Sequence, residues 1–184
     1  MQDNNQAITQ QTRGTINSFI GGDDPDVSMM VGIGLDKESD AVYFKYMGEN
    51  QKPQPLVKPQ SGRPLTRLSN VRLVGISIKE NVGTMNMTKL NVVIKASDGT
   101  QLMLTSGIDS LWTKGLIVAL VALFRTHQVD STFNLDTWRG TSKMRPCFAG
   151  IRVGDAKFKD EQLDDQLYDA FTDRDWETGC RCLK

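Results

Sequence analysis

The sequence predicts a small, mostly β protein of the β-rich α+β class, with a single binding domain over residues 27–154. Short runs rich in β-branched and aromatic residues recur along this region, and turn-forming residues separate them. Residues 115–124 (GLIVALVALF) form the longest apolar run, which is too short to span a bilayer and is typical of a buried helix. A chain of 184 residues is long enough for one domain with tails and a sizeable core.

The N-terminal third predicts a flexible arm, a hairpin and a loop. Residues 1–26 are mostly polar and end in GGDDPD, so we expect a flexible arm with a short helix over residues 12–19. Residues 27–35 and 41–47 are rich in β formers and are separated by DKESD, which favours a hairpin. Residues 48–67 hold four prolines and predict an extended basic loop, with a PxxP-type ligand as the alternative.

The centre of the chain predicts three strands and a helix. Residues 71–79, 90–96 and 101–105 have the composition of strands, and SDG joins the last two as a tight turn. A helix follows over residues 111–124, with Asp109 or Ser106 as its cap, and because it is apolar around most of its surface we expect it to be largely buried.

Two strands and a second helix complete the predicted elements. The strands are residues 132–138 and 147–153, on either side of the basic segment RGTSKMRP. Residues 159–171 place Leu163, Leu167, Ala170 and Phe171 on one face, which predicts an amphipathic helix. This helix belongs to an acidic C-terminal helix and tail over residues 155–184.

Charge is unevenly distributed, although the net charge is zero. Residues 51–154 hold fourteen cations and five anions. Residues 1–50 hold three cations and eight anions, and residues 155–184 hold five cations and nine anions. A basic middle attracts polyanions, which indicates nucleic acid as a partner. The alternative is chance segregation of solvated surface charge.

Residues for catalysis or metal binding are few. The one histidine, His127, directly follows the apolar helix, where the helix dipole also favours a histidine. The sequence has no nucleophile-elbow, phosphate-loop or zinc-protease motif, so we expect no enzyme and no cofactor, with an enzyme that uses His127 as a rival. Cys180 and Cys182 form half of a metal site or a redox pair, or are two exposed thiols; four zinc ligands are not apparent, so no metal is predicted.

Three cysteines and an N-terminus without a secretory leader predict a cytoplasmic protein without a disulfide framework. Cys147 lies in an apolar run and is expected in the core.

The order of the predicted elements resembles that of a known family. Five strands with one helix between the third and the fourth follow each other as in the oligonucleotide-binding (OB) barrel. In this order, in its charge layout and in its acidic C-terminal region, the chain resembles OB-fold single-stranded-DNA-binding proteins over residues 71–184. The resemblance implies an OB-like five-stranded barrel that binds through loops at residues 80–89 and 139–146, with the N-terminal hairpin as an added element. The ending GCRCLK departs from the acidic tip of such proteins.

Cations beside stacking aromatic rings are the means of holding single-stranded nucleic acid. The predicted stacking residues are Phe133 and Trp138, and Trp138 is expected at the base of the mobile basic loop. The predicted phosphate contacts are Lys79, Lys89, Lys95, Arg139, Lys143, Arg145 and Arg152. We therefore expect sequence-tolerant binding of single-stranded DNA in replication or recombination.

The same pattern predicts partners for the two ends of the chain. The acidic segment 155–184 is expected to compete with DNA for the basic surface or to recruit a replication protein, and deleting it is expected to tighten DNA binding. The rival function is a structural or assembly protein, such as a virion or scaffold subunit, in which the arm, the proline-rich loop and the C-terminal helix contact neighbouring copies in a homo-oligomer.

Overall fold

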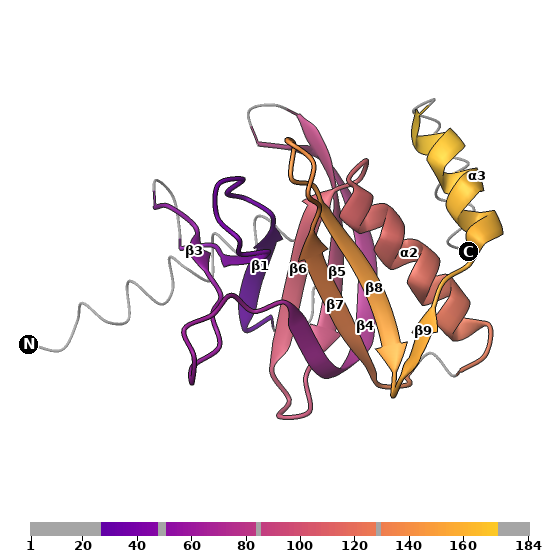
Figure 1. Ribbon diagram of the computed structural model, residues 1–184, viewed down its shortest axis with the longest axis horizontal. Coiled ribbons are helices and arrows are strands. Elements are labelled where there is room, and N and C mark those ends of the chain that lie inside the picture. The colour runs from indigo at the N-terminus through magenta and orange to yellow at the C-terminus, as the bar shows by residue number, and fades with distance from the viewer. Residues whose placement is uncertain (1–26, 48–50, 84–85, 128–129, 173–184) are drawn as a thin grey trace, which may run out of the picture.

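The structure is a computed structural model that describes residues 27–47, 51–83, 86–127 and 130–172. The predicted arm over residues 1–26 and the cysteines at 180 and 182 lie outside the described residues. The strands are β1 (Met29–Ile33), β2 (Tyr43–Lys45), β3 (Gln54–Pro55), β4 (Arg67–Val82), β5 (Met87–Lys95), β6 (Gln101–Gly107), β7 (Phe133–Arg139), β8 (Cys147–Val153) and β9 (Ala156–Phe158). The helices are α2 (Leu111–Phe124) and α3 (Glu161–Thr172) (Figure 1).

The strands form one mixed sheet in the order β3-β2-β1-β6-β5-β4-β7-β8-β9. All neighbours pair antiparallel except β1 and β6, which are parallel. The antiparallel pairing of β1 with β2 confirms the predicted N-terminal hairpin, and the mostly β, α+β class is confirmed as well. Among its described residues, the proline-rich region contributes β3, an isolated bridge between Val57 and Pro64, and the first residue of β4.

The predicted OB-like barrel is not confirmed, because the sheet is open. The five strands of the prediction lie side by side as β6-β5-β4-β7-β8, so a closed barrel needs β6 to pair with β8. Instead, β1 pairs with the second edge of β6 through Met29 to Gly32. The N-terminal hairpin therefore takes the edge that barrel closure requires.

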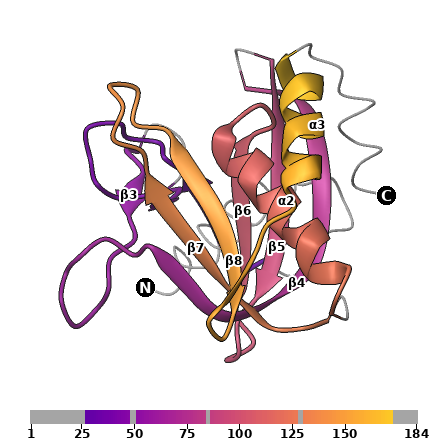
Figure 2. The same ribbon diagram turned by 45° about the vertical axis from the view of Figure 1, so that its right-hand side comes forward.

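The sheet bends at β4, whose two ends pair with different neighbours. Residues Arg67 to Val71 pair with β7, whereas Arg72 to Val82 pair with β5, and a register shift lies in each ladder. Irregularities of this kind increase strand twist and bend. In Figure 2, α2 lies in the opening between the β7–β8 and β5–β4 sides of the bent sheet, and α3 lies outside α2.

Helix α2 has the predicted bounds and is largely buried, but its cap differs from the prediction. Ser110, rather than Asp109 or Ser106, is the N-cap, and its Oγ accepts a hydrogen bond from the Thr113 N–H at 3.1 Å. The hydroxyl of Ser106 bonds to that of Ser110 at 2.8 Å, so Ser106 supports the cap from β6.

Helix α2 packs closely against β8 at one glycine. A Cβ atom at Gly115 would lie 2.8 Å from the carbonyl oxygen of Ala149, so only glycine permits this approach. Helix α3 begins two residues after its predicted start, and its Leu163 is buried in the same core as α2. Cys147 is half-buried at the core boundary, where burial raises the pKa of its thiol.

Candidate functional site

A groove of about 540 Å³ lies along α2 and the strands β7, β8 and β9, and Asp164 of α3 also lines it. One side comes from residues 111–119 of α2 and the other from β7, β8 and β9, and the lining of β8 includes both the core residues Ala149 and Ile151 and the outward residues Phe148 and Arg152. The lining is mostly apolar, with charged side chains along its length. Its charged members are Lys114, Asp136, Arg152, Lys157, Lys159 and Asp164.

Two stacked aromatic rings, one of them exposed, line the groove. Trp138 on β7 pairs across the ladder with Phe148 on β8, and the two rings stack with centroids 5.9 Å apart and planes 18° from parallel. The neighbouring Gly150 leaves room for the indole, because a Cβ atom there would lie 3.3 Å from the Trp138 ring. Trp138 is 48% exposed, so the ring is supported by the sheet and still open to a ligand.

The carboxylate of Asp136 pairs with two arginines on this face. Asp136 lies two residues before Trp138 on the same face of β7, and its carboxylate forms ion pairs with the Arg67 Nε at 2.5 Å and the Arg152 Nε at 2.8 Å. The hydrogen bond with Asp136 raises the pKa of Arg67. Lys157 is opposite Arg152 in the β8–β9 ladder and forms no ion pair among the described residues.

The structure brings Trp138 and Arg152 together, as the sequence predicted for a common site, and adds residues that the sequence did not indicate. The additions that matter most are Lys114, Phe148, Lys157 and Lys159. Alternation along residues 147–153 was the available signal for Phe148, since Cys147 and Phe148 must face opposite sides. Nothing local in the sequence indicates Lys114, which joins the site only because α2 crosses β8.

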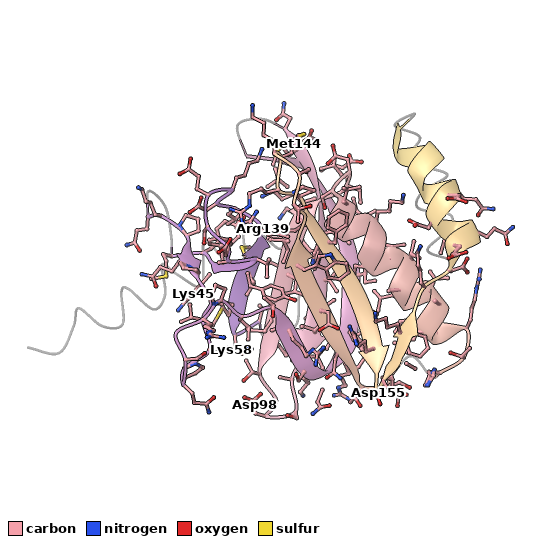
Figure 3. All side chains as sticks on the ribbon, in the orientation of Figure 1. Lys45, Lys58, Asp98, Arg139, Met144 and Asp155 are labelled. Carbon is pink, nitrogen blue, oxygen red and sulfur yellow. The ribbon has the colours of Figure 1, made fainter. Side chains whose placement is uncertain are left out.

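The two arginines of the predicted basic loop instead form hydrogen bonds with residues 36–41, the segment before β2. Arg139 donates to the carbonyl oxygen of Ala41 from Nε at 3.0 Å and from Nη2 at 2.7 Å, and also to that of Asp36. Arg145 donates to the carbonyl oxygens of Lys37 and Glu38, both at 3.2 Å, and forms an ion pair with Asp40. Figure 3 shows Arg139 beside this N-terminal segment. These contacts make phosphate binding by either arginine a weaker expectation than the sequence suggested.

Phe133 is a correction to the predicted stacking residues. Its side chain is 2% exposed and lies in the core with Leu135, because it points to the inner face of β7. A base cannot stack on a ring in that position without opening the core. Lys143 is exposed in the loop between β7 and β8, beside Met144, which Figure 3 places at the tip of that loop.

The predicted cations of β4 and β5 lie outside the groove. Lys79 and Lys89 are directly opposite each other in the ladder, and Lys95 is opposite Arg72 on the same face. Partial burial lowers the pKa of Lys89. The predicted phosphate contacts therefore fall into three groups: the lysines of β4 and β5, the residues around the β7–β8 loop, and Arg152, which alone of the seven lines the groove with Trp138.

Other kinds of site have little support in the described part of the chain. His127 is exposed, its Nδ1 is 2.8 Å from the Thr126 hydroxyl, and its ring packs edge-on against Phe158. No group of three or more potential metal ligands occurs among the described residues. Neither described helix has the length and apolar character needed to cross a membrane.

Comparison with known proteins found no matching family model, no matching curated protein and no matching solved structure. The functional argument therefore rests on the geometry of the groove.

Proposed function

We propose that the groove binds single-stranded DNA in a sequence-tolerant way. One observation carries the proposal: the exposed Trp138 is supported by Gly150 and Phe148 in the same groove as four basic side chains. Aromatic rings beside cations are the means by which proteins hold single strands.

The chemistry of the groove suits the two parts of a nucleotide. A base stacks on Trp138, and such stacking contributes about 1–3 kcal/mol for any of the four bases, because each has a π-face. The apolar wall from Leu111, Val118 and Phe148 accommodates the base edge and the sugar. Lys157 and Arg152 lie on the strands next to the rings, where they meet the phosphates.

The OB-like character and the biological role are parts of the same proposal. The order of strands and helix from β4 to β8 is that of an OB domain, but the proposed binding face is the β7–β8 side with α2. We assign the activity to replication or recombination, since these processes expose single-stranded DNA.

The proposal is tested by fluorescence anisotropy of a labelled oligo-dT strand titrated at two salt concentrations. Trp138→Leu, which keeps an apolar side chain over Gly150, is expected to weaken binding about tenfold, within the range for one lost stack. Met144→Ala is the matched control, because Met144 is 73% exposed in the adjoining loop and does not line the groove. Lack of wild-type binding at low salt, or equal binding by Trp138→Leu, would refute the proposal.

One feature favours the assembly function as a second candidate. Between Arg72 and Ile78, no described strand pairs with the edge of β4 that faces away from β5. Val74, Ile76 and Ile78 are large apolar residues exposed along this stretch. Exposed apolar edges of this length invite pairing with another chain. Size-exclusion chromatography with light scattering distinguishes the candidates, since a large ordered oligomer without DNA affinity favours assembly.

A further inference from the structure

Asp164 of the acidic helix α3 lies in the groove itself. Its carboxylate forms ion pairs with the Lys114 Nζ at 3.1 Å and the Lys159 Nζ at 3.8 Å, and all three residues line the groove. A carboxylate of the protein thus occupies the place beside two lysines where a phosphate of a bound strand would make its contacts.

The first turn of α3 is held in place by contacts that do not involve Asp164. Asp160 accepts a hydrogen bond from the Leu163 N–H at 2.9 Å and forms an ion pair with Arg125 at the end of α2. Leu163 is buried against the core. Asp164 can therefore leave the lysines by rotating its side chain, while the helix stays docked.

We propose that Asp164 is an internal competitor that regulates the affinity of the groove for the phosphates of a single strand. This inference rests on the proposed function. It replaces the expected competition by the whole segment 155–184 with one side chain of the docked first turn. A bound phosphate displaces the Asp164 carboxylate and then pairs with Lys114 and Lys159.

The competition has a consequence for the salt dependence of binding. A lysine that neutralises a phosphate of a single strand releases the counterions of that phosphate. The logarithm of the binding constant then falls with the logarithm of the salt concentration, with a slope of about −0.7 per contact. Asp164 already neutralises one of the two positive charges of Lys114 and Lys159, so the exchange of its carboxylate for a phosphate hides part of this salt dependence. Removing the carboxylate charge should therefore steepen the slope, which a purely structural role of Asp164 would not do.

The test compares Asp164→Asn with Asp165→Asn in oligo-dT titrations over a series of salt concentrations. The control makes the same charge change on the same helix, at an exposed residue that forms no ion pair among the described residues. Asp164→Asn is expected to bind about fivefold more tightly at low salt, from one unit charge at ~4 Å in water. Its log–log salt slope should steepen by about 0.7, whereas Asp165→Asn should resemble the wild type.

A second variant links the effect to the lysine. Adding Lys114→Gln to Asp164→Asn is expected to remove the gain in affinity and the added slope. If the wild type binds through Trp138 but Asp164→Asn matches Asp165→Asn, the competition is refuted and the proposed function stands. If none of the proteins binds oligo-dT, the proposed function fails and the inference fails with it.

Discussion

Replacing Thr137 by valine should destabilise the whole domain, because this hydroxyl joins three elements inside the core. The Thr137 Oγ1 accepts a hydrogen bond from the Trp112 Nε1–H of α2 at 3.0 Å and lies 2.7 Å from the Tyr43 hydroxyl of β2. All three side chains are buried. Burial, more than any other cause, raises the pKa of Tyr43, so its hydroxyl stays protonated and needs a partner.

The magnitude follows from the two polar groups, the Trp112 indole N–H and the Tyr43 hydroxyl, that valine would leave without a hydrogen-bond partner. Valine has nearly the shape of threonine, so little packing is lost. Each buried polar group without a partner costs about 1–3 kcal/mol, which gives an expected loss of about 2–6 kcal/mol in the free energy of unfolding. Tyr43→Phe should cost only about 1 kcal/mol, because Thr137 keeps its bond with Trp112.

The assay is urea unfolding followed by tryptophan fluorescence and circular dichroism. The double variant Tyr43→Phe/Thr137→Val should lose less than the sum of the single losses, because the phenylalanine removes one of the two orphaned groups. A loss below about 1 kcal/mol for Thr137→Val, or simple additivity in the double variant, would refute the view that this hydroxyl is the shared partner.

Two more predictions concern the loops. Arg139→Lys should lower the free energy of unfolding by about 1–3 kcal/mol, because one ammonium group cannot reproduce the hydrogen bonds to Ala41 and Asp36. Lys143→Gln is the control and should unfold like the wild type in the same urea assay. The hydrogen bond from the Thr100 N–H lowers the pKa of Asp98 in the β5–β6 turn. The contribution of this carboxylate to stability is therefore present above the ordinary aspartate pKa, and it is lost as the pH falls through the lowered pKa. A carboxyl NMR titration checks this, and a midpoint at or above that of an aspartate in a model peptide would contradict it.

Local pattern was enough to predict the elements but not how they join. Residues 111–124 and 147–153 are helix and strand with the predicted bounds, because a continuous apolar run and β-forming composition are local signals. The open sheet was not predictable in this way, since it depends on β1 pairing with β6 some seventy positions along the chain. Composition contains no information on which of two edges a hairpin takes. The order of elements, on which the resemblance to an OB barrel rests, could therefore be predicted, whereas the closed barrel that the resemblance implies is not confirmed.

The candidate site shows the same limit for single side chains. Trp138 could be identified because an aromatic residue among polar neighbours near a strand end is locally unusual, and the structure exposes it. The prediction that Phe133 stacks on a base was wrong, because which face of a strand is exposed depends on what covers the sheet. The core and α2 cover the face to which Phe133 points.

The cations show why a charge count overstates a binding surface. Arg139 and Arg145 count as positive in any sum over the sequence, but main-chain carbonyl oxygens of residues 36–41 accept five hydrogen bonds from them. Carbonyl groups have no net charge, so a charge count does not reveal these contacts. Arg152 pairs with Asp136 on the neighbouring strand, and Lys114 pairs with Asp164 on another helix. Both partners are far from these cations in the sequence. If the groove binds a polyanion as proposed, its affinity is expected to depend on how readily the protein's own acceptors release these cations. An aspartate on a helix surface can rotate aside, whereas carbonyls fixed in a loop cannot, and this difference is the reason that Asp164, rather than the basic loop, is expected to control binding.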